Sequence, residues 1–429
     1  MAIDTSIDLR NLQFYQVFIR QFSSTHDFKG VIKQLRRIKD LGTDVIQLVP
    51  FHPIGIFRRK GAIGSPYSIK DYYQIDPMHG DFNDFKQFID FAHAYGMKVI
   101  MDIVFNHTSH DANYTKTHPH WYYQKPDGTF TNRVGDWWDI ADLKIDNNID
   151  LQEELINVLT YWVNLGIDGF RCDVAPLIPK SFWKKARQTL SKINPHLLWV
   201  SESVHRSFIK YLRDLGYEAL SDGEVYQIFD ILYDYDIFDH FENYFTKNAP
   251  LKEWVDNLLD QETIYPANFV KLRYLENHDL ARGANYAKTI AQLRTLNALL
   301  FFLKGSVFIY NGQEIGIKHR PDLFEIDTID WTHQDIASIT PLISYLSDFK
   351  KDANYINDPL TIEMLNAHVL LFKYQRTDQS QEVYGIFNLS SIPQEVNLKI
   401  KGYDILTNDL IKPGLKLITE PIINLRTGF

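Results

Sequence analysis

The chain has 429 residues, of which 45% are hydrophobic and 23% charged, a composition typical of a globular protein with a sizeable core and not of a disordered, collagenous or disulfide-stapled chain. Its formal net charge of −9 argues against a nucleic acid or an anionic membrane as partner, because both are bound mainly through Lys and Arg. The length exceeds one ordinary domain but accommodates an α/β barrel of about 250 residues beside a smaller domain.

The N-terminal residues 1–8 contain neither a basic start nor an apolar run, so we expect no secretory signal and a cytoplasmic location. The single cysteine, Cys172, agrees with a reducing compartment because it can form no internal disulfide. The longest apolar stretch, near 296–303, is far shorter than the roughly 20 residues of a membrane-spanning helix. We therefore expect no interaction with a membrane.

Short β-rich segments alternate with amphipathic helical segments over the first three-quarters of the chain, as in repeated βα units. Apolar residues recur at helical spacing over 28–38, 82–92 and 151–162, for example. An open doubly wound sheet would show a similar rhythm, but eight strands are the number that closes a (β/α)8 TIM barrel, and we predict this α/β fold. The eight predicted strands are 14–19, 44–49, 98–104, 166–172, 197–201, 218–221, 269–275 and 306–310.

Two stretches interrupt this alternation. The polar and aromatic segment after the third strand predicts a small inserted subdomain. After about residue 345 only strands remain, such as 368–374, 382–387 and 394–400, and these predict a C-terminal antiparallel β-sandwich. The predicted domains are the barrel over 1–105 and 150–345, the inserted subdomain over 106–149, and the β-sandwich over 346–429.

Four of the predicted strands end in polar residues. The C-terminal ends of barrel strands meet at one face, and Arg171 lies two residues before Asp173, on the same side of its strand, where it would keep that carboxylate ionised. Taken singly, each such residue could be a helix cap or a solvated charge. Together they indicate an active site, and two carboxyl groups beside one bond are what hydrolysis of a sugar acetal needs. The polar strand-end residues are Asn106, His107, Arg171, Asp173, Glu202, His278 and Asp279.

These four segments resemble the signature regions of the α-amylase family, glycoside hydrolase family 13, whose patterns are approximately D-x-x-x-N-H, G-x-R-x-D, a strand that ends in Glu, and N-H-D. The segment 64–72 resembles the family's loop after the second strand, and 311–314 and 324–331 are similar to family segments as well. The resemblance runs from about Phe14 to Trp331 and includes every catalytic position.

The resemblance implies a role for each matching residue. Asp173 would be the nucleophile of a retaining mechanism with a covalent glycosyl-enzyme, and Glu202 the general acid and base. Asp279 would be a third carboxylate that binds sugar hydroxyls. The other implied contacts are hydrogen bonds to the substrate from His107 and His278, alignment of Asp173 by Arg171, stacking of Tyr67 on the sugar ring, and support of the site by Asp102.

The family also implies hydrolysis of α-glucosidic bonds, with α-1,4 bonds as the first expectation, in maltooligosaccharides or starch-like glucans. A glucan transglycosylase or maltosyltransferase and an oligo-α-1,6-glucosidase would use the same residues, and Val174 recurs among members that cleave α-1,6 bonds or short oligosaccharides. These alternatives stay open. A catalytically inactive sugar-binding or partner-binding protein is disfavoured because Asp173, Glu202 and Asp279 are all present.

Metal binding is the point at which the sequence departs from the family pattern. Asn106 matches a calcium ligand of the family, but Pro176 and Leu177 stand where calcium-dependent α-amylases commonly carry Lys-His. We therefore expect no required cofactor, with Asn106 as the candidate ligand of a dispensable or weak calcium site.

The inserted segment is rich in histidine and aromatic residues. Four histidines stand near Asp111, but no cysteine joins them, so we do not expect zinc. The aromatic residues are either platforms for sugar faces or packing within the subdomain. These residues are His107, His110, His118 and His120, and Trp121, Tyr122, Tyr123, Trp137 and Trp138.

Overall fold

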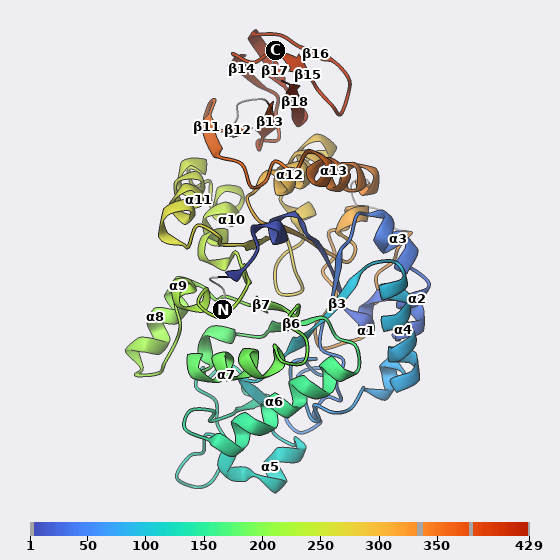
Figure 1. Ribbon diagram of the computed structural model, residues 1–429, viewed down its shortest axis with the longest axis vertical. Helices are drawn as coiled ribbons and strands as arrows, with labels where there is room; N and C mark the ends of the chain where they lie inside the picture. The colour runs from blue at the N-terminus through green and yellow to red at the C-terminus, as the bar shows by residue number, and fades with distance from the viewer. Residues whose placement is uncertain (1–3, 333–337, 377–380, 428–429) are drawn as a thin grey trace.

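The computed structural model describes residues 4–332, 338–376 and 381–427, and a closed barrel of eight parallel strands lies at its centre (Figure 1). The strands follow one another around the barrel in the order β1-β10-β9-β8-β7-β6-β3-β2, and pairing of β1 with both β10 and β2 closes it. The predicted (β/α)8 class is confirmed. The barrel strands are β1 (Gln13–Val17), β2 (Val45–Leu48), β3 (Lys98–Ile103), β6 (Gly169–Cys172), β7 (Leu198–Ser201), β8 (Ile231–Tyr233), β9 (Lys271–Arg273) and β10 (Ser306–Tyr310).

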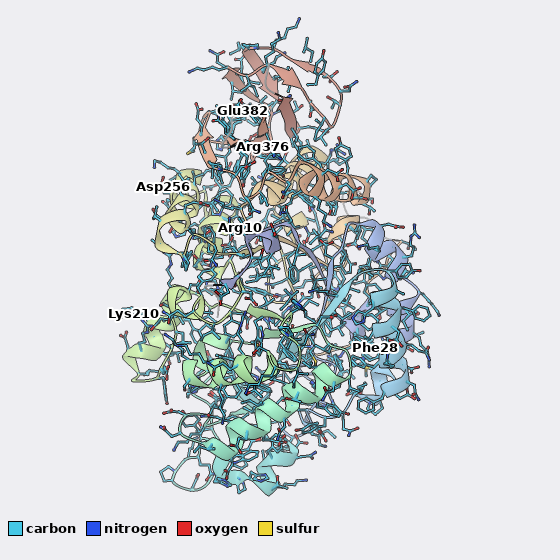
Figure 2. All side chains as sticks on the ribbon, in the orientation of Figure 1. Arg10, Phe28, Lys210, Asp256, Arg376 and Glu382 are labelled. Atoms are coloured by element: carbon cyan, nitrogen blue, oxygen red, sulfur yellow. The ribbon has the colours of Figure 1, made fainter. Side chains whose placement is uncertain are left out.

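Helices cover the outside of the barrel, and all three predicted helical patterns fall on them. In α4, Asp81 and Asp84 form a capping box, and Phe85 and Phe88 recur on the buried face. Phe28 of α2, labelled in Figure 2, packs its ring 5.5 Å from each of those two rings. No helix in the described ranges is both long and apolar enough to cross a membrane. The helices are α1 (Ile19–Phe22), α2 (Phe28–Ile32), α3 (Leu35–Asp40), α4 (Phe82–Ala94), α6 (Ile149–Asn164), α7 (Lys180–Leu190), α8 (Arg206–Asp214), α9 (Asp222–Val225), α10 (Tyr235–Lys247), α11 (Leu251–Ile264), α12 (Ile290–Phe302) and α13 (Thr340–Ala353).

The predicted sixth strand is wrong. Residues 218–221 are not a strand but lead into α9, whose start is fixed by a capping box between Ser221 and Glu224. The sixth barrel strand is instead β8, which has only three residues. Asp230 and Asp234 flank β8 and make the segment look like a polar loop, yet both are buried and paired with arginines. Pairing in the folded barrel, which the local sequence does not reveal, makes these carboxylates compatible with a strand.

The segment between β3 and α6 forms a small antiparallel sheet and one short helix. Some of its aromatic residues pack within the segment, whereas others are exposed. Trp121 and Tyr122 are buried, and Trp121 stacks on His118 with ring centroids 3.9 Å apart. Trp138 is 51% exposed, and the Lys60 ammonium group lies over its ring. The elements of this segment are β4 (His107–Ser109), α5 (Asn113–Thr117) and β5 (Ile140–Asp142).

Antiparallel sheets follow the barrel and lie beyond α12 and α13 in Figure 1. A four-stranded sheet in the order β11-β12-β13-β18 and two two-stranded sheets enclose a second hydrophobic core. The predicted boundary at 345 falls inside α13, whose Ile343 and Leu346 are buried in the barrel core, so the strand-only region begins at β11. The strands are β11 (Leu360–Met364), β12 (Val369–Gln375), β13 (Gln381–Asn388), β14 (Gln394–Leu398), β15 (Gly402–Tyr403), β16 (Leu410–Ile411), β17 (Gly414–Ile418) and β18 (Ile422–Thr427).

Candidate active site

A cavity of about 330 Å³ opens at the C-terminal ends of the barrel strands, where the sequence predicts an active site. Asp173 follows β6, Glu202 follows β7 and Asp279 lies beyond β9. Asp102 and Arg171 are fully buried next to this lining. The predicted residues that line the cavity are Tyr67, His107, Asp173, Glu202, His278 and Asp279.

Arg171 connects the carboxyl groups of the site. Its Nη1 lies 2.9 Å from Asp173 Oδ1 and 3.0 Å from Asp102 Oδ2, and its Nη2 lies 2.7 Å from Glu202 Oε1. Arg171 and Asp102 are partners in the register of β6 and β3, and the two-residue period of a strand brings Asp173 to the same side as Arg171. One positive charge thus faces three carboxyl groups, which disfavours ionisation of all three at once.

A chain of contacts fixes the residues after β9. The Tyr67 hydroxyl donates to Asp102 Oδ2 at 2.7 Å and lies 2.6 Å from His278 Nε2, and the two rings stack with centroids 5.2 Å apart. His278 Nε2 also lies 3.1 Å from Asp279 Oδ2. Gln16 of β1 contacts the other ring nitrogen of His278 at 3.2 Å. The orientation of His278 and Asp279 is therefore set by the barrel before any ligand arrives.

The carboxyl groups of the cavity differ in their protonation. Burial and the neighbouring Glu202 raise the pKa of Asp173, and burial raises the pKa of Glu202, so the pair holds a proton at a pH where free carboxyls have lost theirs. Arg171 donates a hydrogen bond to Asp173, whereas its contact with Glu202 lacks hydrogen-bond alignment. The two carboxyl groups therefore titrate as a pair that shares a proton. Burial alone would raise the pKa of Asp279, but the adjacent His278 lowers it, which favours an ionised Asp279.

Val174, directly after Asp173, adopts a backbone conformation that valine rarely takes. Its φ of 35° and ψ of 43° lie in the left-handed region, which costs a β-branched residue about 1–3 kcal/mol. In this conformation its N–H donates to Glu202 Oε2 at 2.7 Å. Val174 therefore positions Glu202 through the backbone, a role that its side chain type did not suggest.

Two glutamines of the site were missed in the sequence. Gln16 lies in β1, and Gln47 lies in β2 and donates to Asp102 Oδ1 at 3.0 Å and to the Tyr233 hydroxyl at 2.9 Å. Both glutamines are buried. A glutamine inside an apolar strand signals a polar contact in the barrel interior, because buried amides need partners. The identity of the partner depends on closure of the barrel.

The Asn106 side chain, the candidate calcium ligand, is already engaged by an arginine. Its Oδ1 accepts a hydrogen bond from Arg133 Nη2. Arg133 Nε donates to Asp142 Oδ2 at 2.9 Å, and its Nη1 donates to the Leu177 carbonyl at 3.3 Å. A hard cation would need such oxygens as ligands, so calcium does not fit here while Arg133 holds them. Within the described ranges, no group of three or more His, Cys, Asp and Glu is arranged to bind a metal.

His107 and Trp137 complete the wall next to the inserted segment. Both line the cavity, with ring centroids 5.9 Å apart. Burial lowers the pKa of His107, so its imidazole is neutral. A neutral imidazole beside an aromatic ring offers both a hydrogen bond and an apolar surface, a combination that suits a sugar.

Comparison with known proteins agrees with this geometry. The solved structure of an alpha-amylase from Lactobacillus plantarum is 38% identical, with a TM-score of 0.93 over 98% of this chain and 100% of that one. A noncanonic maltogenic alpha-amylase, AmyB from Thermotoga neapolitana, is 30% identical, with a TM-score of 0.87 over the same shares. Alpha-amylase MalA of Haloarcula japonica is 26% identical over 92% of this chain and 58% of its own length, and the chain spans about half the length of such curated relatives.

The match to a family model extends over most of the barrel. The model of the alpha-amylase catalytic domain matches residues 16–358, a range that contains every barrel strand after β1 and every residue of the cavity described above. The strand-end carboxylates, the buried arginine between them and this match lead to one conclusion: the chain belongs to the α-amylase family.

Proposed function

We propose that this protein is a retaining glycoside hydrolase that cleaves α-glucosidic bonds, α-1,4 bonds first among them, in maltooligosaccharides. One observation carries the proposal: a single guanidinium, that of Arg171, holds Asp173 and Glu202 at the wall of one cavity. An ionised carboxylate beside a protonated carboxyl is what a covalent glycosidase mechanism needs. The alpha-amylase names of the relatives support a glucan as the substrate.

In the first step, Glu202 gives its proton to the oxygen of the scissile bond while Asp173 attacks the anomeric carbon. The bond to that oxygen breaks, the leaving sugar departs as an alcohol, and an ester to Asp173 remains. In the second step, the ionised Glu202 takes a proton from water, whose oxygen attacks the same carbon and releases Asp173. Two inversions give net retention of configuration.

The other residues bind or orient. Asp279, ionised beside His278, accepts hydrogen bonds from sugar hydroxyls, and the neutral His107 contacts another hydroxyl. The Tyr67 ring packs against the sugar. Arg171 is a positioning residue because it acts through Asp173, and Asp102 supports the site by fixing Arg171 and Tyr67.

Substrate length provides the first test. We expect a higher kcat/KM on maltooligosaccharides of a few units than on soluble starch, because a cavity of about 330 Å³ lies at the lower end of the roughly 300–1,000 Å³ of small-molecule sites. Initial rates on maltotriose, maltoheptaose and amylose measure the preference, with isomaltotriose as the linkage control. A clear preference for amylose would contradict the short-substrate proposal. Products longer than the substrate, formed when maltose is added, would indicate transfer of the sugar to an acceptor instead of hydrolysis.

We also propose that the enzyme works without calcium. Arg133 supplies a positive charge to Asp142 and Asn106 and joins them to Leu177, just beyond Val174. The side chains of Arg133 and Asp142 are 9% and 0% exposed. The Arg133 guanidinium therefore supplies the positive charge that would otherwise come from a bound calcium ion.

Removal of metal should leave the stability of the protein unchanged, whereas removal of the Arg133 side chain should lower it. Dialysis against a chelator is expected to leave activity and the thermal unfolding midpoint unchanged. Arg133→Ala is expected to destabilise the protein by about 3–5 kcal/mol, because it strands a buried carboxylate. Arg133→Lys keeps the positive charge but loses the planar guanidinium, which makes several hydrogen bonds at once. It should therefore be less destabilising than Arg133→Ala but less stable than the wild type. The calcium-free proposal fails if the chelator abolishes activity and calcium alone restores it.

A further inference from the structure

We propose that an ion pair between Lys60 and Asp139 closes the side of the cavity that faces away from Glu202, so that the enzyme removes short units from the non-reducing end of a glucan. This inference rests on the proposed hydrolase function and adds the direction in which a bound chain can extend. Lys60 Nζ lies 2.8 Å from Asp139 Oδ1. Both residues line the same cavity as Asp173.

The pair joins two segments that are far apart in the chain. Lys60 comes from the loop between β2 and α4, and Asp139 directly precedes β5. The Lys60 side chain is 24% exposed and that of Asp139 is 5% exposed, so the pair is largely shielded from water and salt. The backbone of Asp139 is fixed as well, because Ser68 Oγ donates to its carbonyl at 3.2 Å. The inserted segment is thereby tied to the loop after β2.

The loop after β10 completes this wall. The backbone N–H groups of Ile63 and Gly64 donate to the Phe324 carbonyl at 3.0 and 3.1 Å. Lys60 Nζ lies 5.9 Å from the centroid of the Phe324 ring and 5.4 Å from that of Trp138, so the ammonium group is near two aromatic rings. The wall is therefore built from three interlinked segments.

The position of this wall in the barrel determines in which direction a bound glucan can extend. In the strand order, β2 and β10 flank β1, and β1 lies across the barrel from β7, which carries Glu202 at its end. A general acid faces the leaving sugar, so the wall stands on the side of the sugar that is transferred to Asp173. A glucan seated for cleavage can extend past Glu202 but meets Lys60 and Asp139 in the other direction.

The test uses maltoheptaose labelled at its reducing end with a fluorophore, either with a free non-reducing end or with that end blocked by a 4,6-O-ethylidene group. We expect the wild-type enzyme to cleave the free substrate at least about tenfold faster than the blocked one. The double variant Lys60→Ala/Asp139→Ala should reduce this ratio to within about threefold. Lys70→Ala is the matched control, because the ion pair of Lys70 with Asp111, at 3.8 Å, involves no residue of the cavity lining.

If the double alanine variant does not fold, variants that exchange the charges of Lys60 and Asp139 provide a second test. Lys60→Glu alone should lose the discrimination, and Lys60→Glu/Asp139→Lys should regain it, with circular dichroism reporting the fold. The wall proposal is overturned if the wild-type enzyme cleaves both substrates equally, or if a folded variant without the pair keeps the wild-type ratio. If the wild-type enzyme cleaves neither substrate, the hydrolase function is overturned together with the wall.

Discussion

Asp173→Asn is expected to lower kcat by roughly 10⁴-fold or more, because the amide has the shape of the carboxylate but forms no ester with the sugar. We expect the variant to fold. Asp173 lines a cavity and is one of three carboxyl groups around Arg171, so Asp102 and Glu202 still pair with the guanidinium after the change. The loss should therefore appear in turnover and not in the thermal unfolding midpoint.

The measurement is the initial rate on an aryl α-maltoside, paired with a thermal unfolding curve for each variant. Asp214→Asn is the matched control: this carboxylate pairs with Lys210 on α8, where both side chains are more than half exposed, and Figure 2 shows Lys210 at the outer edge of the molecule. The control should keep full activity. Near-normal turnover by Asp173→Asn would contradict its role as nucleophile.

Glu202→Gln is expected to lower kcat on maltooligosaccharides by about 10²–10⁴-fold, the usual contribution of a general acid. The loss should be smaller for maltosyl fluoride, because fluoride leaves without protonation of a sugar oxygen. Comparison of the two substrates separates acid catalysis from a general disturbance of the site. Because Glu202 also acts as the base in the second step, the comparison uses kcat/KM, which reports the first step. An equal loss of kcat/KM on both substrates would contradict the assignment of Glu202 as the acid.

The pH dependence of the rate should test the assignment of Glu202 as the acid independently. Burial raises the pKa of Glu202, so the acid keeps its proton to a higher pH than an exposed glutamate. The rate should therefore be maintained as pH rises past the ordinary glutamate pKa and should fall only when Glu202 itself ionises. In Glu202→Gln this alkaline fall should be absent from the residual rate on maltosyl fluoride.

Local pattern was sufficient for most of the fold. Seven barrel strands alternate with helical segments, and their apolar runs are long enough to be recognised. The strand β8 could not be recognised in the sequence, because its three residues lie between Asp230 and Asp234. The charges of these two residues are neutralised by arginines from other elements. Likewise, α13 lies across the predicted boundary at 345 because Ile343 and Leu346 pack on the barrel, a contact that no local pattern contains.

The candidate site divides in the same way. The residues in the strand-end motifs could be predicted because each motif carries its own residue types and spacing, and the barrel brings them together at Arg171. The ion pair of Lys60 with Asp139 and the hydrogen bond from Arg133 to the Leu177 carbonyl could not be predicted in this way. Each joins the inserted segment to a distant part of the chain, so its existence depends on tertiary packing and not on local sequence.

The covalent step on Asp173 can be tested most directly by mass spectrometry of the enzyme after inactivation with a 5-fluoro-α-glucosyl fluoride, which slows release of the glycosyl-enzyme more than its formation. We predict that one peptide gains the mass of one fluoroglucosyl unit and that fragmentation places it on Asp173. Asp173→Asn should gain no label under the same conditions. A label on another residue, or turnover of the reagent with no labelled peptide at all, would contradict a retaining mechanism with Asp173 as its nucleophile.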